Sequence, residues 1–140
     1  MHDAQAAYEK AIELLNEAES SNRSNVKFYR MLSLLWGRLS ELEILKEQID
    51  RGLHFAELSA QVSRSLYEAN QLSADVVRDM IMDLVKLSEI RAKLGQLNEA
   101  ADSYKEAKAI VARGLIDGDL STSDAWMEEE LAGRIRLLLS

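Results

Sequence analysis

The chain of 140 residues contains no cysteine and no proline, and only 6% of its residues are aromatic. The absence of cysteine excludes disulfides, thiolate nucleophiles, zinc fingers and cysteine-ligated iron–sulfur sites. Because proline breaks helices and shapes loops, its absence favours a mostly helical fold with short connections. The β-branched and aromatic clusters that mark strands are also missing.

Long apolar runs and an excess of positive charge are absent as well. No apolar run approaches the roughly 20 residues that span a membrane, and no basic region followed by an apolar stretch marks a signal peptide. Together with the lack of cysteine, this predicts a cytoplasmic protein. The net charge is −7. Such a surface repels phosphate, so we expect neither nucleic acid nor an anionic membrane as a partner.

Apolar residues recur at helical spacing along almost the whole chain. Clusters of Gly, Ser and Asn, which cap helices and turn chains, interrupt this pattern at residues 20–25, 51–52, 70–73, 95–96 and 114–123. We therefore predict an all-α fold of about six helices, at about residues 3–19, 25–49, 54–69, 74–94, 98–114 and 122–139. Connections this short make neighbouring helices antiparallel.

Several single residues bear on where these helices begin and end. Ser73 and Asn98 are candidate N-caps, and Gly114 is interpreted as the residue that ends the fifth helix. The apolar stripe of the second helix continues across Gly37, which favours one long helix although an internal glycine costs about 1 kcal/mol relative to alanine. The alternative breaks this helix at Gly37 and restarts it at Ser40.

Residues 84–110 carry a repeat pattern. Gly95 stands at the turn between two helices, and the small, aromatic and small positions of the second helix are Ala100, Tyr104 and Ala107. This segment resembles a tetratricopeptide repeat, with the full copy at about residues 81–114. The resemblance implies a right-handed solenoid of stacked antiparallel hairpins, in which the alanines let paired helices approach and Tyr104 fills the gap to the next pair.

The remaining chain fits the same scheme as a single helical-repeat domain of residues 1–140. Residues 3–20 form half a repeat, residues 25–70 a degenerate repeat, residues 74–114 the repeat and residues 122–139 a capping helix. The degenerate copy is aligned by matching Leu39 with Leu84. The pattern departs from the family at Ser88, which replaces a smaller residue, and at the missing terminal proline. Starting on a half repeat suggests a piece of a longer protein, the alternative being that the first helix is a cap.

The resemblance implies that the first helix of each hairpin lines a concave surface, which a partner's peptide or helix can occupy. The predicted lining residues are Ser40, Ile44 and Gln48 on the second helix and Met82, Val85, Lys86, Glu89 and Lys93 on the fourth. The alternative is that the first or sixth helix covers these residues as ordinary core. The asparagines with which some family members clamp a peptide carboxylate beside such lysines are missing, so a solvated charged face is favoured there.

Residues that carry chemistry form no complete motif. His2 and His54 lack metal-ligand spacing, and no nucleophile triad, phosphate loop, paired-carboxylate motif or Glu-x-x-His pair occurs. Part of a calcium-loop spacing is present at Asp117, Asp119, Ser121 and Glu128. Thr122 stands where that loop needs glycine and Asp124 where it needs an apolar residue, so we expect these residues to cap the last helix. We predict no enzyme, cofactor or metal.

Two functions remain open at this point. The first is a scaffold or adaptor that binds a protein or peptide partner in the helical groove. The second is an oligomerisation or regulatory segment of a larger protein that self-associates, because exposed apolar ends of repeat stacks attract another copy. The second hypothesis depends on the half-repeat start and on the apolar end of the chain at residues 135–139. The apolar stripe of the last helix is predicted to be Trp126, Met127, Leu131, Ile135 and Leu138.

Overall fold

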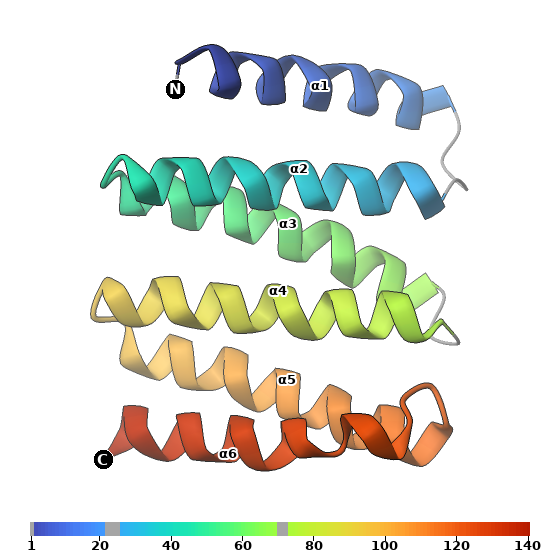
Figure 1. Ribbon diagram of the computed structural model, residues 1–140, viewed down its shortest axis with the longest axis vertical. Coiled ribbons are helices and arrows are strands. Elements are labelled where there is room, and N and C mark those ends of the chain that lie inside the picture. Colours follow the sequence, from blue (N-terminus) through green and yellow to red (C-terminus); the bar gives the residue numbers. More distant parts are fainter. Residues whose placement is uncertain (1, 22–25, 70–72) are drawn as a thin grey trace. The chain divides into compact units, whose positions relative to one another are not determined.

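The computed structural model describes residues 2–21, 26–69 and 73–140 (Figure 1). The predicted turn residues 22–25 and 70–72 lie outside this description. The described elements are α1 (His2–Ser21), α2 (Val26–Leu45), α3 (Ile49–Ala69), α4 (Ala74–Lys93), α5 (Leu97–Asp117), the 3₁₀ turn η1 (Thr122–Asp124) and α6 (Trp126–Leu139). No strand occurs among the described residues, which confirms the predicted all-α class. None of the described helices has the length and apolar character needed to cross a bilayer.

The chain divides into two compact units, Met1–Leu66 and Tyr67–Ser140, with the division inside α3. In the first unit, α1 packs against α2, and α2 forms a hairpin with α3. In the second unit, α5 packs against both α4, drawn above it, and α6, drawn below it (Figure 1). Because α5 is antiparallel to both neighbours, α4 and α6 run in the same direction.

The first unit combines an apolar core with buried hydroxyl groups. Trp36 on α2 and Phe55 on α3 stack with ring centroids 5.6 Å apart. Between the same helices, the Ser33 hydroxyl lies 3.0 Å from the hydroxyls of both Ser59 and Ser63. These contacts satisfy buried polar groups and favour one axial register of the hairpin. One apolar cluster of this unit consists of the buried residues Ile12, Leu32 and Leu39, with Tyr8, Phe28, Leu35, Trp36, Phe55 and Val62 packed around them.

The second unit has its core between α4, α5 and α6. Tyr104 is only 5% exposed, and Ala100 and Ala107 are fully buried. The small side chains allow α5 to lie close to α4, as the sequence predicted. The buried residues of this core are Val77, Met80, Ile81, Leu84, Tyr104, Ala107, Ile110, Val111, Leu120 and Leu131.

The chain reverses between α2 and α3 earlier than predicted. α2 runs unbroken through Gly37, which confirms the single long helix, but it ends at Leu45. Glu47 takes the left-handed conformation in the turn, with φ 61°. Gly52, predicted to mark this turn, lies inside α3, where a Cβ would come within 2.7 Å of Cγ1 of Ile44. The missing side chain at Gly52 thus lets α3 approach α2.

A second glycine has a packing role that the sequence did not indicate. Gly114 was predicted to end its helix, yet α5 continues to Asp117 and ends at Gly118, which has φ 83°. A Cβ on Gly114 would lie 2.8 Å from Cγ and Cδ1 of Leu120. The prediction for Gly114 was wrong because this glycine makes room for the buried leucine of the following loop.

The predicted caps have mixed outcomes. Ser73 is the N-cap of α4, since its side chain accepts a hydrogen bond from the N–H of Val76 at 3.5 Å. Asn98 is not a cap, because α5 begins at Leu97. Ser121 and Asp124 form a capping box over η1. The expectation that this loop caps the last helix was wrong, because the N-cap of α6 is Ala125, which receives no side-chain capping bond.

The hairpins α2–α3 and α4–α5 share the same turn, 48 residues apart. Gly95 has φ 78° at the position equivalent to Glu47, and the backbone hydrogen bonds around the two residues match in donor and acceptor positions. In particular, the N–H of Gln48 donates to Glu43 at 2.8 Å, and that of Gln96 donates to Arg91 at 2.9 Å.

Beyond the turn, each hairpin is joined by a buried serine. The hydroxyl of Ser40 donates to the carbonyl of Gly52 at 2.7 Å, and that of Ser88 donates to the carbonyl of Ala100 at 2.9 Å. The internal repeat therefore has a displacement of 48 residues, which corrects the alignment of Leu39 with Leu84 used above. In the structural alignment Leu84 corresponds to Trp36.

Candidate functional site

The predicted lining residues of α2 belong to the first unit. Ser40 is 4% exposed, and its hydroxyl is bonded to α3. The structure therefore places Ser40 inside the hairpin and not on a groove surface, which corrects its predicted place. Ile44 is half-buried, with its side chain over Gly52, while Gln48 is exposed at the turn.

The five predicted lining residues of α4 follow one side of that helix in the second unit. Met82 is 52% exposed, and Lys86, Glu89 and Lys93 are exposed as well. Val85 is half-buried and packs against the core. Residues spaced by three and four share a helix face, so α4 presents an apolar segment followed by charged residues.

Arg134 on α6 joins this side of α4 to the other two helices of the unit. Its guanidinium donates to Glu89 on α4 and to Glu130 on α6, both at 3.1 Å, and to the Tyr104 hydroxyl on α5 at 3.4 Å. The guanidinium carbon also lies 5.8 Å from the centre of the Tyr104 ring. The hydrogen bond with Tyr104 contributes most to raising the pKa of Arg134, the two carboxylates add to it, and partial burial opposes it. Arg134 thus stays charged at physiological pH.

A second ion pair links α4 to the segment just before α6. Arg78 lies 3.0 Å from Asp124. The hydrogen bond from Arg78 and that from the N–H of Ser121 lower the pKa of Asp124 below its ordinary value. Arg78 and Glu89 are eleven residues apart on α4, or about 16 Å along the helix axis. The two links therefore fix α6 alongside α4 at two separate levels.

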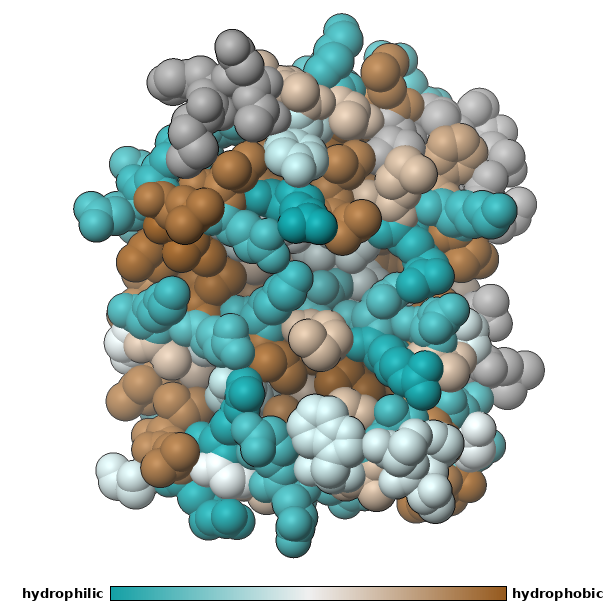
Figure 2. Space-filling model, in the orientation of Figure 1, coloured by the Kyte–Doolittle hydropathy of each residue, from teal (hydrophilic) through white to brown (hydrophobic). Residues whose placement is uncertain are grey.

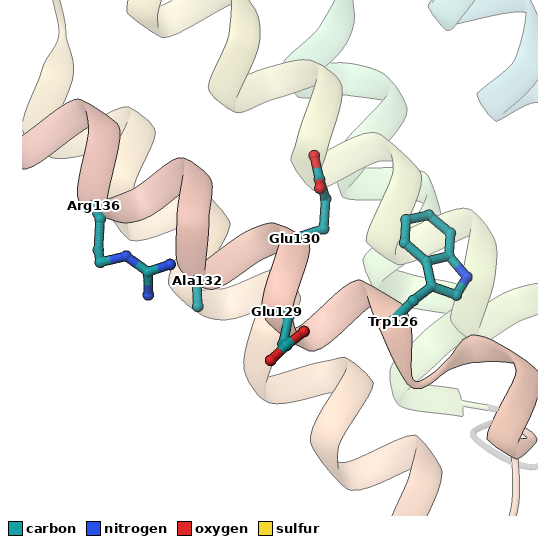
Figure 3. A pocket seen from close by; sticks show the side chains of 5 residues that line it. All are labelled: Trp126, Glu129, Glu130, Ala132 and Arg136. Carbon is teal, nitrogen blue, oxygen red and sulfur yellow. The ribbon is translucent and has the colours of Figure 1, made fainter.

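Trp126 and Glu130 lie on the same side of α6, and Glu129, Ala132 and Arg136 lie on the other (Figure 3). Trp126 was predicted to belong to the apolar stripe, but it is 65% exposed. We name the exposed surface formed by this side of α4 and this side of α6 the α4–α6 face. Hydrophilic and apolar residues are interleaved over it (Figure 2). Its residues are Arg78, Met82, Val85, Lys86, Glu89 and Lys93 of α4 and Trp126, Glu130 and Arg134 of α6.

Sequence reasoning missed the α6 half of this face. Trp126, Glu130 and Arg134 are spaced by four residues, so a common helix face could have been inferred for them. No sequence pattern shows, however, that Arg134 contacts Glu89, because that pair depends on how α6 packs in the unit.

Two hollows border α6. One, of about 480 Å³, is lined by Trp126, Glu129, Glu130, Ala132 and Arg136 (Figure 3). The other, of about 440 Å³, lies between α5 and α6 and is lined by Lys105, Lys108, Ala109, Ala112, Glu128, Ala132, Ile135 and Arg136. Both have charged walls and small residues in their lining.

One carboxylate of the first unit is fully buried. Glu43 lies 3.5 Å from Nζ of Lys46 and 3.5 Å from Nε of Arg51. Neither of its oxygens accepts a hydrogen bond from another described residue. Lys46 also donates to the side-chain oxygen of Gln5 on α1. Glu43 is therefore held by two cations at the turn between α2 and α3, where it has a structural role.

Other residues that could carry chemistry stay apart. Among the described side chains, no three His, Asp or Glu residues are grouped so as to hold a metal ion. Asp117, from the partial calcium-loop spacing, pairs with Arg113 at 3.4 Å, while Ser121 caps η1. His54 is exposed on α3, and the side chain of His2 lies outside the described structure. Comparisons of the chain with protein-family models, with curated proteins and with solved structures found no match.

Proposed function

We propose that the chain is a non-catalytic protein–protein interaction module, a scaffold or adaptor that binds a peptide or helix of a partner protein on the α4–α6 face. The observation that carries this proposal is the exposure of Met82 and Trp126 on one face whose helices are fixed by the Arg134 contacts. Exposed tryptophan and methionine beside ordered charges are typical of protein-binding surfaces.

The internal repeat supports a tetratricopeptide-like arrangement of the hairpins. In the corrected alignment, Trp36, Leu39 and Ser40 follow the Trp-x-x-Leu-Gly pattern of that family, with a serine in place of the glycine. The equivalent serine of the second hairpin, Ser88, is buried against Ala100. The 48-residue period is longer than the family's roughly 34, and it contains the long helices α3 and α4, of 21 and 20 residues.

The proposed binding mode buries the two exposed apolar side chains and leaves charged residues at the rim. A bound helix or extended peptide would cover Met82 and Trp126, while Lys86, Lys93 and Glu130 would select the charge of its flanking residues. Because an exposed tryptophan that becomes buried is often a hot spot, Trp126→Ala should weaken binding by about 2 kcal/mol, or about 30-fold.

A peptide-display selection on the purified chain, followed by affinity measurement with variants, tests this proposal. Met82→Ala and Trp126→Ala should each weaken the selected ligands, because both side chains are exposed on the face and dispensable for folding. Ile116→Ala is the matched control, since Ile116 is 84% exposed on α5, outside the face. Ligands that bind all three variants equally well, or a folded chain that selects none, would overturn the proposal.

A further inference from the structure

The side of α6 opposite to the α4–α6 face carries opposite charges at its two ends. Glu129 and Arg136 are seven residues apart and both project from this side, as does Ala132 (Figure 3). Ala132 and Gly133 lie midway between them in the sequence. These four residues are named the outer face of α6. This face is therefore acidic at the Glu129 end, has small residues in the middle and is basic at the Arg136 end.

We propose that the outer face of α6 binds the same face of a second copy of this chain, in an antiparallel two-fold pair. A two-fold axis through the middle of Ala132 and Gly133 places Glu129 of each copy opposite Arg136 of the other. The two charged residues lie about 10 Å apart along the helix, so one register satisfies both ion pairs and a shift by a turn satisfies neither. Charge complementarity thus favours a second copy over a different partner.

The shape of the surface allows two helices to approach closely at the axis. A Cβ added at Gly133 would meet only the Arg136 guanidinium, at 3.8 Å. Beside it, Ala109 and Ala112 of α5 line the hollow of about 440 Å³ between α5 and α6. Small residues at a helix crossing reduce the distance between the axes. The hollow therefore leaves room for side chains of the second copy.

One neighbouring charge on α5, that of Lys105, reinforces the same orientation. α5 is antiparallel to α6 and Tyr104 contacts Arg134, so Lys105 lies toward the Arg136 end of the hollow. Lys108 lines the same hollow but lies one turn further along α5, level with Glu130, so only Lys105 adds to the basic end. Within the described part of the chain, Lys105, Lys108, Glu129 and Arg136 form no ion pair. The basic end of one copy is thus available to the acidic first turn of the other copy's α6.

Charge exchange on the purified chain tests this pairing without any partner protein. One helix against one helix is a small interface, so we expect a wild-type dimer with a Kd of about 10–100 µM in analytical ultracentrifugation. Glu129→Arg and Arg136→Glu each create two like-charge pairs per dimer and should weaken association at least about tenfold. Glu13→Arg is the control, because it makes the same charge change as Glu129→Arg on an exposed residue of α1 in the first unit.

The decisive step is to mix the two weakened variants. In the antiparallel pair, Glu129→Arg opposite Arg136→Glu restores attraction at both ends, so the mixture should form a heterodimer. Circular dichroism confirms that each variant is folded. A wild-type chain that stays monomeric at about 1 mM, or a mixture that associates no better than its components, would overturn the inference. The inference does not rest on the proposed partner-binding face, whose residues stay unchanged in this experiment.

Discussion

Replacing Gly52 by alanine tests whether close packing, and not a turn, requires glycine at this position. A Cβ at residue 52 would lie 2.7 Å from Cγ1 of Ile44 and 3.2 Å from the carbonyl oxygen of Ser40. The first neighbour is a branched side chain close to its own backbone, and the second is backbone. Neither can yield without moving α2 and α3 apart. Gly37→Ala is the matched control, because a Cβ there meets only Oγ of Ser59, at 3.9 Å.

The expected magnitudes follow from two opposing contributions. Replacing a helical glycine by alanine stabilises the helix by about 1 kcal/mol, and overpacking a tight site costs about 1–3 kcal/mol. Gly37→Ala should therefore raise the free energy of unfolding by about 1 kcal/mol. Gly52→Ala should leave it unchanged or lower it by up to about 2 kcal/mol. Since both positions are helical, the difference of about 1–3 kcal/mol mainly reports the steric contact.

Urea unfolding followed by circular dichroism measures both variants, with unchanged m-values showing that the extent of unfolding is the same. Combining Gly52→Ala with Ile44→Ala removes the side chain that the new Cβ meets, so the cost of Gly52→Ala should fall on that background. If Gly52→Ala stabilised the chain as much as Gly37→Ala does, the packing role assigned to Gly52 would be refuted.

Further predictions concern the second unit. Ser88→Ala removes a buried hydroxyl that bonds to an α5 carbonyl and should lower the free energy of unfolding in urea by about 1–3 kcal/mol. The control, exposed Ser65→Ala, should lower it by almost nothing. Equal effects of the two variants would contradict the role of the Ser88 hydroxyl in joining α4 to α5. Tyr104→Ala should cost about 3–5 kcal/mol, whereas Tyr104→Phe, which loses only the long contact with Arg134, should cost under about 1 kcal/mol. The lowered pKa of Asp124 stabilises the fold above the ordinary carboxyl range, and this contribution disappears as the pH falls through the lowered value. Arg78→Gln should raise that pKa toward its ordinary value in a ¹³C NMR titration, and an unchanged value would exclude Arg78 as the cause.

The helices of this chain were predictable because apolar spacing records which side of each helix is buried. Ser73 was recognisable as a cap, and the burial of Ala100, Tyr104 and Ala107 followed from a small–aromatic–small pattern. These features depend on local sequence and on helical geometry, which one chain displays without its tertiary structure.

The errors occurred where tertiary packing decides the role of a residue. Gly52 and Gly114 resemble turn residues in the sequence, but each makes room for a side chain from another segment. The true turn between α2 and α3 contains Glu47 in a left-handed conformation, and its neighbours Lys46 and Gln48 are good helix formers. No local signal therefore marks this chain reversal.

The candidate site was half predictable for the same reason. The lining predicted for α4 rested on the resemblance, and of its residues Met82 and Lys86 are exposed. Trp126 fits the apolar spacing of α6 as well as any core residue does, yet it lies at the edge of the stripe and is exposed. The contact of Arg134 with Glu89 joins residues 45 positions apart, and only the packed unit reveals it.

The duplicated turn has a consequence for engineering this chain by recombination. A hybrid in which α2 passes through the Gly95 turn into α5 would keep every backbone hydrogen bond of the reversal. It would not keep the interior, because Ser33 would then face Ala107 and Val111 in place of Ser59 and Ser63 and would lose its hydroxyl partners. The joint between the helices is thus interchangeable between the hairpins, whereas each pair of facing surfaces is matched only to itself.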